Sequence, residues 1–378
     1  MESCDPWIPF QDIENDLWRE AKRFKASSNG PVIGHLLPDV PEEIIHAAGA
    51  FPLAIEGASS QVALSPAHIP GYTCSHVMGA LDMGLSGSLE NMDALVIPYV
   101  CDSTRNLSHL WKRLFPDKPS ELLRIPKRLE FCGARDYLIT EYRRLYQWVC
   151  DLAGNDPDPQ RLSRSVELYE HSRSLLRKAF LKHKSSPGVW TVARLRSLFN
   201  SALRSDRTQH IEWMNGLPWD SPDEASGSFE RVYVKGKVWD PPQIAGMMDE
   251  LGMGLAEDET AAGHRSVAVT VSLNGDPFAA LADRIMTSIP YTGYHVEPSG
   301  LVRDFIGRVR DSGASGVIIL NPKFCEAAAF DTPDLVNALS KESIPNLVLE
   351  TSARSFSVGQ LRLRLEAFRE ILGTEMYS

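Results

Sequence analysis

Short apolar runs alternate with longer amphipathic stretches along much of the chain. Residues 32–36, 52–55 and 94–100 are each apolar and nearly continuous, which is typical of strands covered on both faces of a sheet. Residues 122–125 are a shorter candidate of the same kind. Between the first two runs, Pro41 and the two glutamates after it predict the first turn of a helix. Strands separated by helices predict a parallel sheet.

Residues 134–217 have a different pattern, with apolar positions at helical spacing and no run typical of a strand. We expect a helical connector there, followed by a polar, turn-rich linker at 218–230. Strand and helix patterns then alternate again as far as an amphipathic helix at 358–372. The predicted fold class is α/β, with two Rossmann-like parallel-sheet domains joined by a helical connector. The predicted segments are an N-terminal helix within 1–30, a first α/β domain at 31–133, the connector at 134–217 and a second α/β domain at 218–378.

Two segments, one in each predicted α/β domain, share a pattern. Residues 94–107 (ALVIPYVCDSTRNL) and 316–330 (GVIILNPKFCEAAAF) each give a buried strand, a short turn, a cysteine followed by an acid, and a helix. Ligands in open α/β sheets bind at the carboxyl ends of the strands, which is where Cys101 and Cys325 fall. Each cysteine also precedes a helix N-terminus, a position that favours a thiolate.

A third cysteine, Cys74, occurs where a glycine-containing loop becomes a helix. Three thiolates from two domains suit a [4Fe–4S] cluster in the cleft between the domains, with one iron left without a cysteine. The spacing has no C-x₂-C run, and three buried core cysteines without a ligand role remain the alternative. We expect Cys132 and Cys150 to be such core cysteines.

Composition narrows the classes of function. The chain has 378 residues, six cysteines, 43% hydrophobic residues and a formal charge of −10, without the basic stripe of a nucleic-acid-binding protein. It has no run of about 20 apolar residues that would span a membrane, and its N-terminus does not resemble a secretory signal. We therefore expect a cytoplasmic protein with reduced thiols and no membrane or nucleic-acid partner.

Several stretches together resemble a known family: the smaller subunits of ATP-dependent benzoyl-CoA reductases and (R)-2-hydroxyacyl-CoA dehydratases. Cys74, Cys101 and Cys325 match the three cluster cysteines of that family, so the resemblance implies that they bind a [4Fe–4S] cluster. The chain departs from the family at EDETAAGHR (257–265), which lacks an expected cysteine, and at Pro290-Tyr291, where Pro-Cys is common. The stretches that carry the resemblance are PEEIIHAAGAFPL, GLSG before DALVIPYVCDSTRNLSHLWKRLFPDKP, KGKVWDPPQIAGMMDELG, GDPFAALADR and SGVIILNPKFCEAAAFDTPDL, with IPNLVLET and QLRLRLEAF.

The resemblance also implies a reaction and partners. A separate ATPase activator with its own cluster delivers single low-potential electrons, a paralogous larger subunit pairs with this chain, and an acyl-CoA thioester becomes a radical anion. RNLSHLW after Cys101 is more similar to the reductase branch, which dearomatises a ring, than to the dehydratase branch, which eliminates water. A metal-free protein with two domains that clamp a small ligand is a third hypothesis, from a different class.

Nucleotide motifs and other polar residues add little to this picture. The sequence contains no G-x-x-x-x-G-K-[ST], and no G-x-G-x-x-G after a strand, so we expect no ATP or NAD site in this chain. His264 and Arg265 follow a predicted strand and are candidates for proton donation or phosphate binding, although a structural role is the more common one for such a pair. Asp102 is a candidate for a contact near the cluster or, equally, a helix cap.

Overall fold

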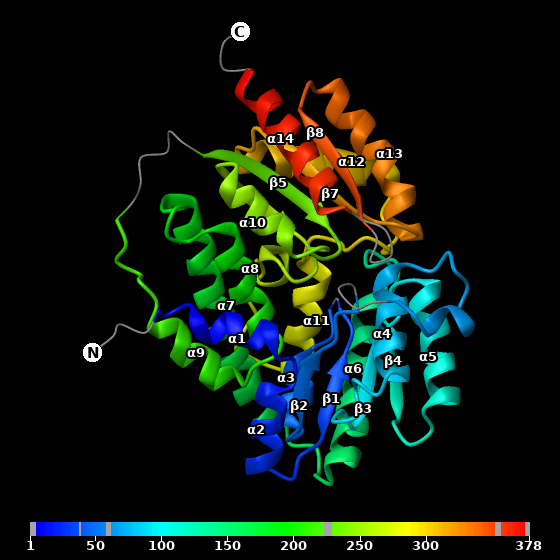
Figure 1. The fold of residues 1–378 in the computed structure, drawn as a ribbon. Helices are drawn as coiled ribbons and strands as arrows, with labels where there is room; N and C mark the ends of the chain where they lie inside the picture. The colour runs from blue at the N-terminus through cyan, green and yellow to red at the C-terminus, as the bar shows by residue number, and fades with distance from the viewer. Residues whose placement is uncertain (1–4, 38, 58–61, 223–228, 352–356, 375–378) are drawn as a thin grey trace.

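Two four-stranded parallel sheets, each enclosed by helices, make up the protein, one above the other in Figure 1. The computed structural model describes residues 5–37, 39–57, 62–222, 229–351 and 357–374. Among these residues are eight strands and fourteen α-helices. The prediction of two parallel α/β sheets is thereby confirmed.

The first sheet has the strand order β2 (Phe51–Ala54), β1 (Val32–His35), β3 (Ala94–Pro98), β4 (Ser120–Leu123). Strands β1, β2 and β3 are buried at every position, because helices cover both faces of the sheet. The helices on one face are α2 (Arg19–Ser27), α4 (Ser75–Leu85) and α5 (Asp102–Leu114), and those on the other are α3 (Glu42–Ala47) and α6 (Ala134–Ala153).

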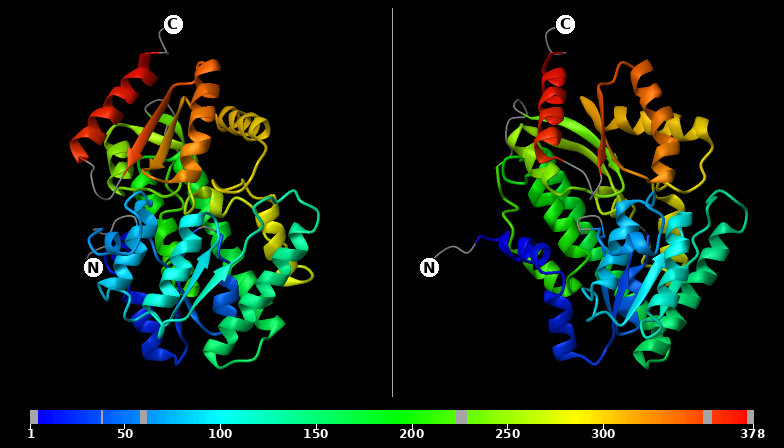
Figure 2. Two further views of the ribbon diagram at one scale, coloured as in Figure 1. Left: turned by 90° about the vertical axis from the view of Figure 1, so that its right-hand side faces the viewer. Right: turned by 45° about the vertical axis from the view of Figure 1, so that its right-hand side comes forward.

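The second sheet repeats this arrangement with the order β6 (Met253–Glu259), β5 (Glu230–Gly236), β7 (Gly316–Pro322), β8 (Asn346–Thr351). All of its strand pairs are parallel. Helices α10 (Gln243–Glu250) and α14 (Val358–Thr374) cover one face, and α12 (Pro298–Ser312) and α13 (Glu326–Lys341) cover the other. The carboxyl ends of both sheets are directed toward the middle of the molecule (Figures 1 and 2).

The predicted connector is helical throughout and links the two sheet-bearing lobes. It contains α6, α7 (Pro159–Ser185), α8 (Val192–Ala202) and α9 (Arg207–Asn215). The long helix α7 contacts both α3 of the first lobe and β6 of the second. Side chains of Asp158, Thr191 and Asp206 cap α7, α8 and α9 by accepting a backbone N–H.

Packing crosses the predicted domain boundaries. Helix α11 (Pro277–Thr287) belongs to the second half of the sequence but packs on α6, and α1 (Ile8–Asn15) packs on α8. The four predicted segments remain a proposal for units that fold separately. Residues 223–228 of the predicted linker lie outside the described residues, as does Cys4.

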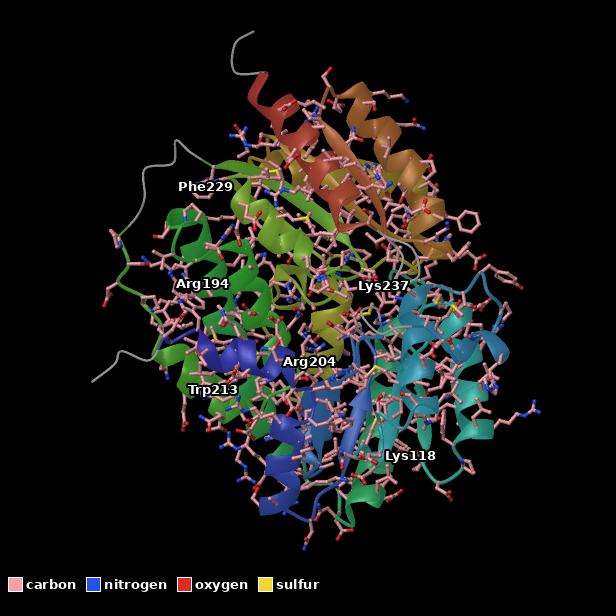
Figure 3. All side chains as sticks on the ribbon, in the orientation of Figure 1. Lys118, Arg194, Arg204, Trp213, Phe229 and Lys237 are labelled. Carbon is pink, nitrogen blue, oxygen red and sulfur yellow. The ribbon has the colours of Figure 1, made fainter. Side chains whose placement is uncertain are left out.

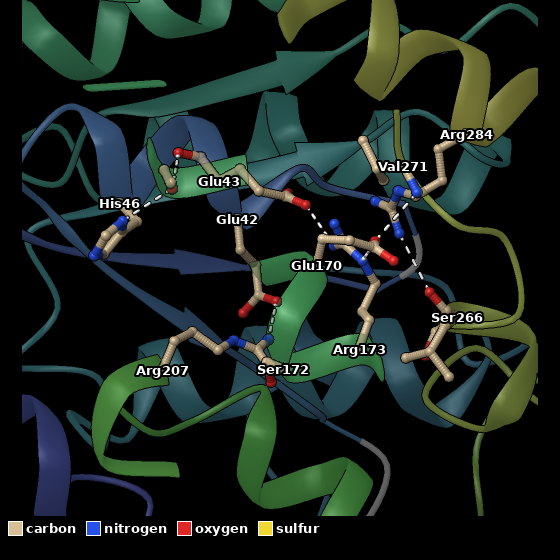
Figure 4. A network of polar contacts seen from close by, with 12 residues as sticks. Glu42, Glu43, His46, Glu170, Ser172, Arg173, Arg207, Ser266, Val271 and Arg284 are labelled. Atoms are coloured by element: carbon tan, nitrogen blue, oxygen red, sulfur yellow. Dashed lines mark hydrogen bonds and ion pairs between the residues drawn. The ribbon is translucent and has the colours of Figure 1, made fainter. Parts of the chain in front are cut away.

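Buried charges join the connector to the first lobe (Figure 4). Glu43 of α3 pairs with Arg173 of α7, which also donates to Glu170 at 3.0 Å. Burial raises the pKa of Glu43, but Arg173 and Arg284 together outweigh burial and the pKa falls to about 2. A second pair, Glu42 with Arg207, fixes α3 to α9 at 2.5 Å. These pairs hold α3 in place between the two longer helices.

Some sequence-based expectations were wrong in detail. The single helix expected within residues 1–30 is two helices, α1 and α2, because the chain is extended at Asp16. Cys132 is exposed, whereas Cys150 is buried as predicted. No helix within the described ranges is both long and apolar enough to cross a membrane.

Candidate metal centre

Three cysteines occupy the same local position, the N-cap of a helix. Cys74 precedes α4, Cys101 precedes α5 and Cys325 precedes α13. Each thiol therefore lies beside backbone N–H groups that have no partner within the helix, where negative charge is favoured. The predicted sequence of strand, short turn, cysteine and helix is confirmed in both lobes, at β3–α5 and β7–α13.

The three cysteines line one cavity between the two lobes. Cys74 and Cys101 come from the first lobe, and Cys325 comes from the second. Strands β3 and β7 lie third in the order of their respective sheets, so Cys101 and Cys325 follow equivalent strands. The two carboxyl edges face each other, and the thiols meet there because parallel strands place their following residues at one edge.

Local hydrogen bonds fix the two cysteines that follow strands. The backbone N–H of Cys101 donates to the Thr104 hydroxyl at 3.3 Å, and its thiol lies 3.9 Å from the same oxygen. Burial raises the pKa of the Cys325 thiol, and a backbone N–H of Ala328 and the nearby Lys237 act in the opposite direction.

Lys237 and Tyr291 complete the wall of the cavity. Lys237 directly follows β5 and is 5% exposed, and Figure 3 places it at the junction of the two lobes. Burial alone would lower the pKa of Lys237, but the nearby thiols of Cys74, Cys325 and Cys101 and the Tyr291 hydroxyl act in the opposite direction and the pKa is raised. Burial also raises the pKa of Tyr291.

Cysteine thiols are the usual donors to an iron–sulfur cluster. Among the residues that the structure describes, no three His, Cys, Asp or Glu side chains lie close enough together to hold one ion. In a [4Fe–4S] cluster each thiolate binds a different iron, so the sulfurs do not need to converge on one point. Three thiols, three helix N-termini and a buried ammonium around one cavity match the negative charge of such a group. The structure itself does not show the cluster.

A groove opens beside the cysteine cavity and shares Ser103, Phe324 and Glu326 with it. The loop before α4 forms one side of the groove, and the first turns of α5 and α13 form the other. Asp102 also lines the groove. Its exposed carboxylate pairs with Arg105 at 3.4 Å, and the helix cap is Cys101 rather than Asp102.

His264 and Arg265 lie elsewhere and have structural partners. The His264 ring bonds to Glu257 at 2.6 Å and stacks on Phe180. Arg265 is buried and pairs with Asp39 at 3.2 Å. Neither residue lines the cysteine cavity or the groove beside it, so their predicted roles as proton donor or phosphate ligand find no support in this geometry.

Lys237 was not predicted as a site residue, and Tyr291 was noted only as a departure from the family pattern. Lys237 could have been predicted from the sequence, because it falls at the carboxyl end of a buried strand. The same position led to the prediction of Cys101 and Cys325 as site residues. Tyr291 lies in a loop between α11 and α12, and no local pattern predicts that this loop returns to the edge of the sheet.

Comparison with known proteins identifies the family of the chain. The family described as 2-hydroxyglutaryl-CoA dehydratase, D-component, matches residues 39–372. A benzoyl-CoA reductase subunit from Thauera aromatica is 26% identical over 97% of this chain and 94% of its own length. The beta subunit of (R)-2-hydroxyglutaryl-CoA dehydratase from Acidaminococcus fermentans is 24% identical over 96% and 98%. The beta subunit of (R)-phenyllactyl-CoA dehydratase from Clostridium sporogenes is 21% identical over 98% and 100%. The predicted kinship is confirmed: the chain belongs to the 2-hydroxyglutaryl-CoA dehydratase D-component family, which includes subunits of benzoyl-CoA reductases and 2-hydroxyacyl-CoA dehydratases.

Proposed function

We propose that this chain is the iron–sulfur subunit of an enzyme of the benzoyl-CoA reductase type. The observation that carries the proposal is the cavity between the lobes, which is lined by three helix-capping cysteines in a member of this family. Cys74, Cys101 and Cys325 would each hold one iron of a [4Fe–4S] cluster. When bound, the cluster would supply single low-potential electrons to an acyl-CoA thioester.

The protein's own residues would shape the environment of that chemistry. Backbone N–H groups at three helix ends would stabilise negative charge on the sulfurs. Cys74 is 2% exposed and Val100 is also 2% exposed, so this side of the cavity is closed to water. Access would come from the side of Phe324, which is 47% exposed and also lines the neighbouring groove. Limited solvent access protects reactive intermediates and strengthens local electrostatics.

The groove bears on where the substrate is held. Its described lining includes the carboxylates Asp102 and Glu326 but no lysine or arginine. Coenzyme A carries phosphates, which proteins often bind with Lys or Arg side chains, and the two helix N-termini at this groove each carry an acidic residue in the first turn, which disfavours an anion there. We therefore propose that the acyl end of the substrate approaches the groove and that a paralogous larger subunit holds most of the coenzyme A. The relatives are themselves named as single subunits of their enzymes, which supports such a partner.

The electron source would be a separate ATPase activator with its own cluster, itself reduced by ferredoxin. RNLSHLW (105–111) in α5, the helix that follows Cys101, supports reduction of an aromatic acyl-CoA. Elimination of water from an (R)-2-hydroxyacyl-CoA is the second candidate reaction. It is supported by the dehydratase subunits, whose sequence identities to this chain are close to that of the reductase subunit.

The test is an anaerobic assay of this chain with its larger subunit, activator, ATP and a low-potential reductant. We expect consumption of benzoyl-CoA coupled to ATP hydrolysis and no turnover of (R)-2-hydroxyacyl-CoA. Turnover of the hydroxyacyl-CoA alone would assign the dehydratase reaction. Inactivity toward both substrates, together with a colourless iron-free chain, would favour the metal-free ligand-binding hypothesis.

A further inference from the structure

Lys237 is a buried cation in the wall of the candidate cluster site. It directly follows β5, which lies between β6 and β7 in its sheet. It is 5% exposed and lines the same cavity as Cys74, Cys101 and Cys325. An ammonium group in such a place is costly unless negative charge compensates it.

Lys235, two residues before Lys237 and within β5, shows how a buried lysine is compensated elsewhere in this sheet. Lys235 is also buried, but it pairs with the carboxylate of Glu259 on β6. The groups that most raise the pKa of Lys237 are the three thiols and the Tyr291 hydroxyl, and Glu326, the one carboxylate among the described lining residues, is not one of these groups. The natural counter-charge of Lys237 is therefore whatever negative charge the three cysteines hold.

The charge of a cluster at this position changes with its oxidation state. Three thiolates around a 2+ core give a net charge of about −1, and reduction to a 1+ core makes it about −2. A fixed positive charge in a poorly solvated site stabilises the more negative state more strongly. Removing that charge should make the cluster harder to reduce.

We infer that Lys237 is the counter-ion of the cluster, a positioning residue that raises its reduction potential. The inference rests on the proposed function, because it requires a cluster on the three cysteines. It assigns a task to a cavity residue that is not one of the three proposed iron ligands. Tyr291, at the Pro290-Tyr291 departure from the family pattern, contributes a neutral phenol to the wall of the cavity. Lys237 is the only cation among the described lining residues.

The test compares the full-length wild type with Lys237→Met, Lys237→Arg and Lys323→Met, each reconstituted anaerobically with iron and sulfide. Lys323 is the matched control, since it lies two residues before Cys325 but its side chain is 44% exposed. Iron content and the midpoint potential, followed by EPR during a redox titration, are measured for each protein.

We expect Lys237→Met to keep its iron but to show at least a tenfold lower reduced-to-oxidised ratio at a fixed potential, which is about 59 mV for a one-electron couple. Lys237→Arg and Lys323→Met should titrate like the wild type. Loss of iron in Lys237→Met alone, with retention in Lys237→Arg, would also support charge compensation. An unchanged potential in Lys237→Met, or loss of iron in both Lys237 variants, would overturn the inference. A wild type without iron would instead refute the proposed function, and this inference with it.

Discussion

Each of the three cavity cysteines occupies a position where Ser, Thr, Asp or Asn is the usual choice. N-cap residues of those types accept a backbone N–H through a side-chain oxygen. At the starts of α4, α5 and α13 a cysteine is present instead. A thiol is a poorer cap than a hydroxyl, so capping alone does not account for three cysteines at equivalent positions around one cavity.

Serine substitution separates iron binding from folding at these sites. Cys74→Ser, Cys101→Ser and Cys325→Ser should each lose most of the bound iron, because a hydroxyl is a much weaker ligand for iron than a thiolate. Each helix should stay intact or gain up to about 1 kcal/mol from the better cap. Iron content and circular dichroism of the purified variants would check both expectations.

Cys150→Ser is the matched control for these variants. Cys150 is fully buried inside α6, and burial raises the pKa of its thiol to about 11, so it should remain a thiol. This variant should keep the iron of the wild type. Equal iron in all four variants would contradict the ligand assignment.

Single site residues could be predicted from the sequence where one physical rule applied, namely that ligands bind at the carboxyl ends of parallel strands. Cys101 and Cys325 were predicted from their place after buried strands, and Lys237 could have been found in the same way. The position of Arg265 could not, because its partner Asp39 is 226 residues away in the sequence. Only the folded chain shows that this arginine is already paired.

At the scale of elements, the repeated order of four parallel strands explains why both lobes present a cysteine at the same edge. Apolar runs predicted all four strands of the first sheet to within about two residues, because buried strands leave a continuous apolar pattern, although two of the four residues of β4 are only half-buried. The break at Asp16 and the packing of α11 on α6 were not predictable, because the first depends on local backbone geometry and the second on long-range packing.

His183 of α7 links the helical connector to the second sheet, and it should make the free energy of unfolding depend on pH. Its ring bonds to the carbonyl of Trp190 and accepts the N–H of Leu255 in β6 at 2.7 Å. Burial lowers the pKa of His183 from 6.5 to about 4. The folded state thus favours the neutral ring, so the stabilisation is complete above pH 6.5 and is lost as the pH falls toward 4.

We expect the wild type to lose roughly 2 kcal/mol of unfolding free energy between pH 6.5 and 5 through this group, at about 1.4 kcal/mol per pH unit. His183→Gln, which stays neutral, should lack this part of the pH dependence in urea unfolding. His171→Gln changes an exposed histidine of the same helix and serves as the control. Identical pH slopes in wild type and His183→Gln would refute the assignment.

At the scale of the whole molecule, the site depends on two lobes meeting closely. Gly293 shows how close this approach is: an added Cβ would lie 2.6 Å from the carbonyl oxygen of Val100, the residue before Cys101. Its φ of +106° also favours glycine. Gly293→Ala should therefore disturb the junction that brings Cys101 near Cys325.

Gly275→Ala provides the comparison, because Gly275 has a similar φ of +92° but nothing within 4 Å of an added Cβ. Both variants should lose about 1–2 kcal/mol from backbone strain. Gly293→Ala should lose roughly 1–3 kcal/mol more from the close contact and should bind less iron. Thermal unfolding and iron analysis would check this, and equal losses with equal iron would show that the junction tolerates the change.

The iron and acid-labile sulfide content of the full-length chain, purified without oxygen, tests the central claim most directly. A brown protein with about four irons and four sulfides per chain is the predicted result. A colourless protein that binds neither, even after anaerobic reconstitution, would contradict the account.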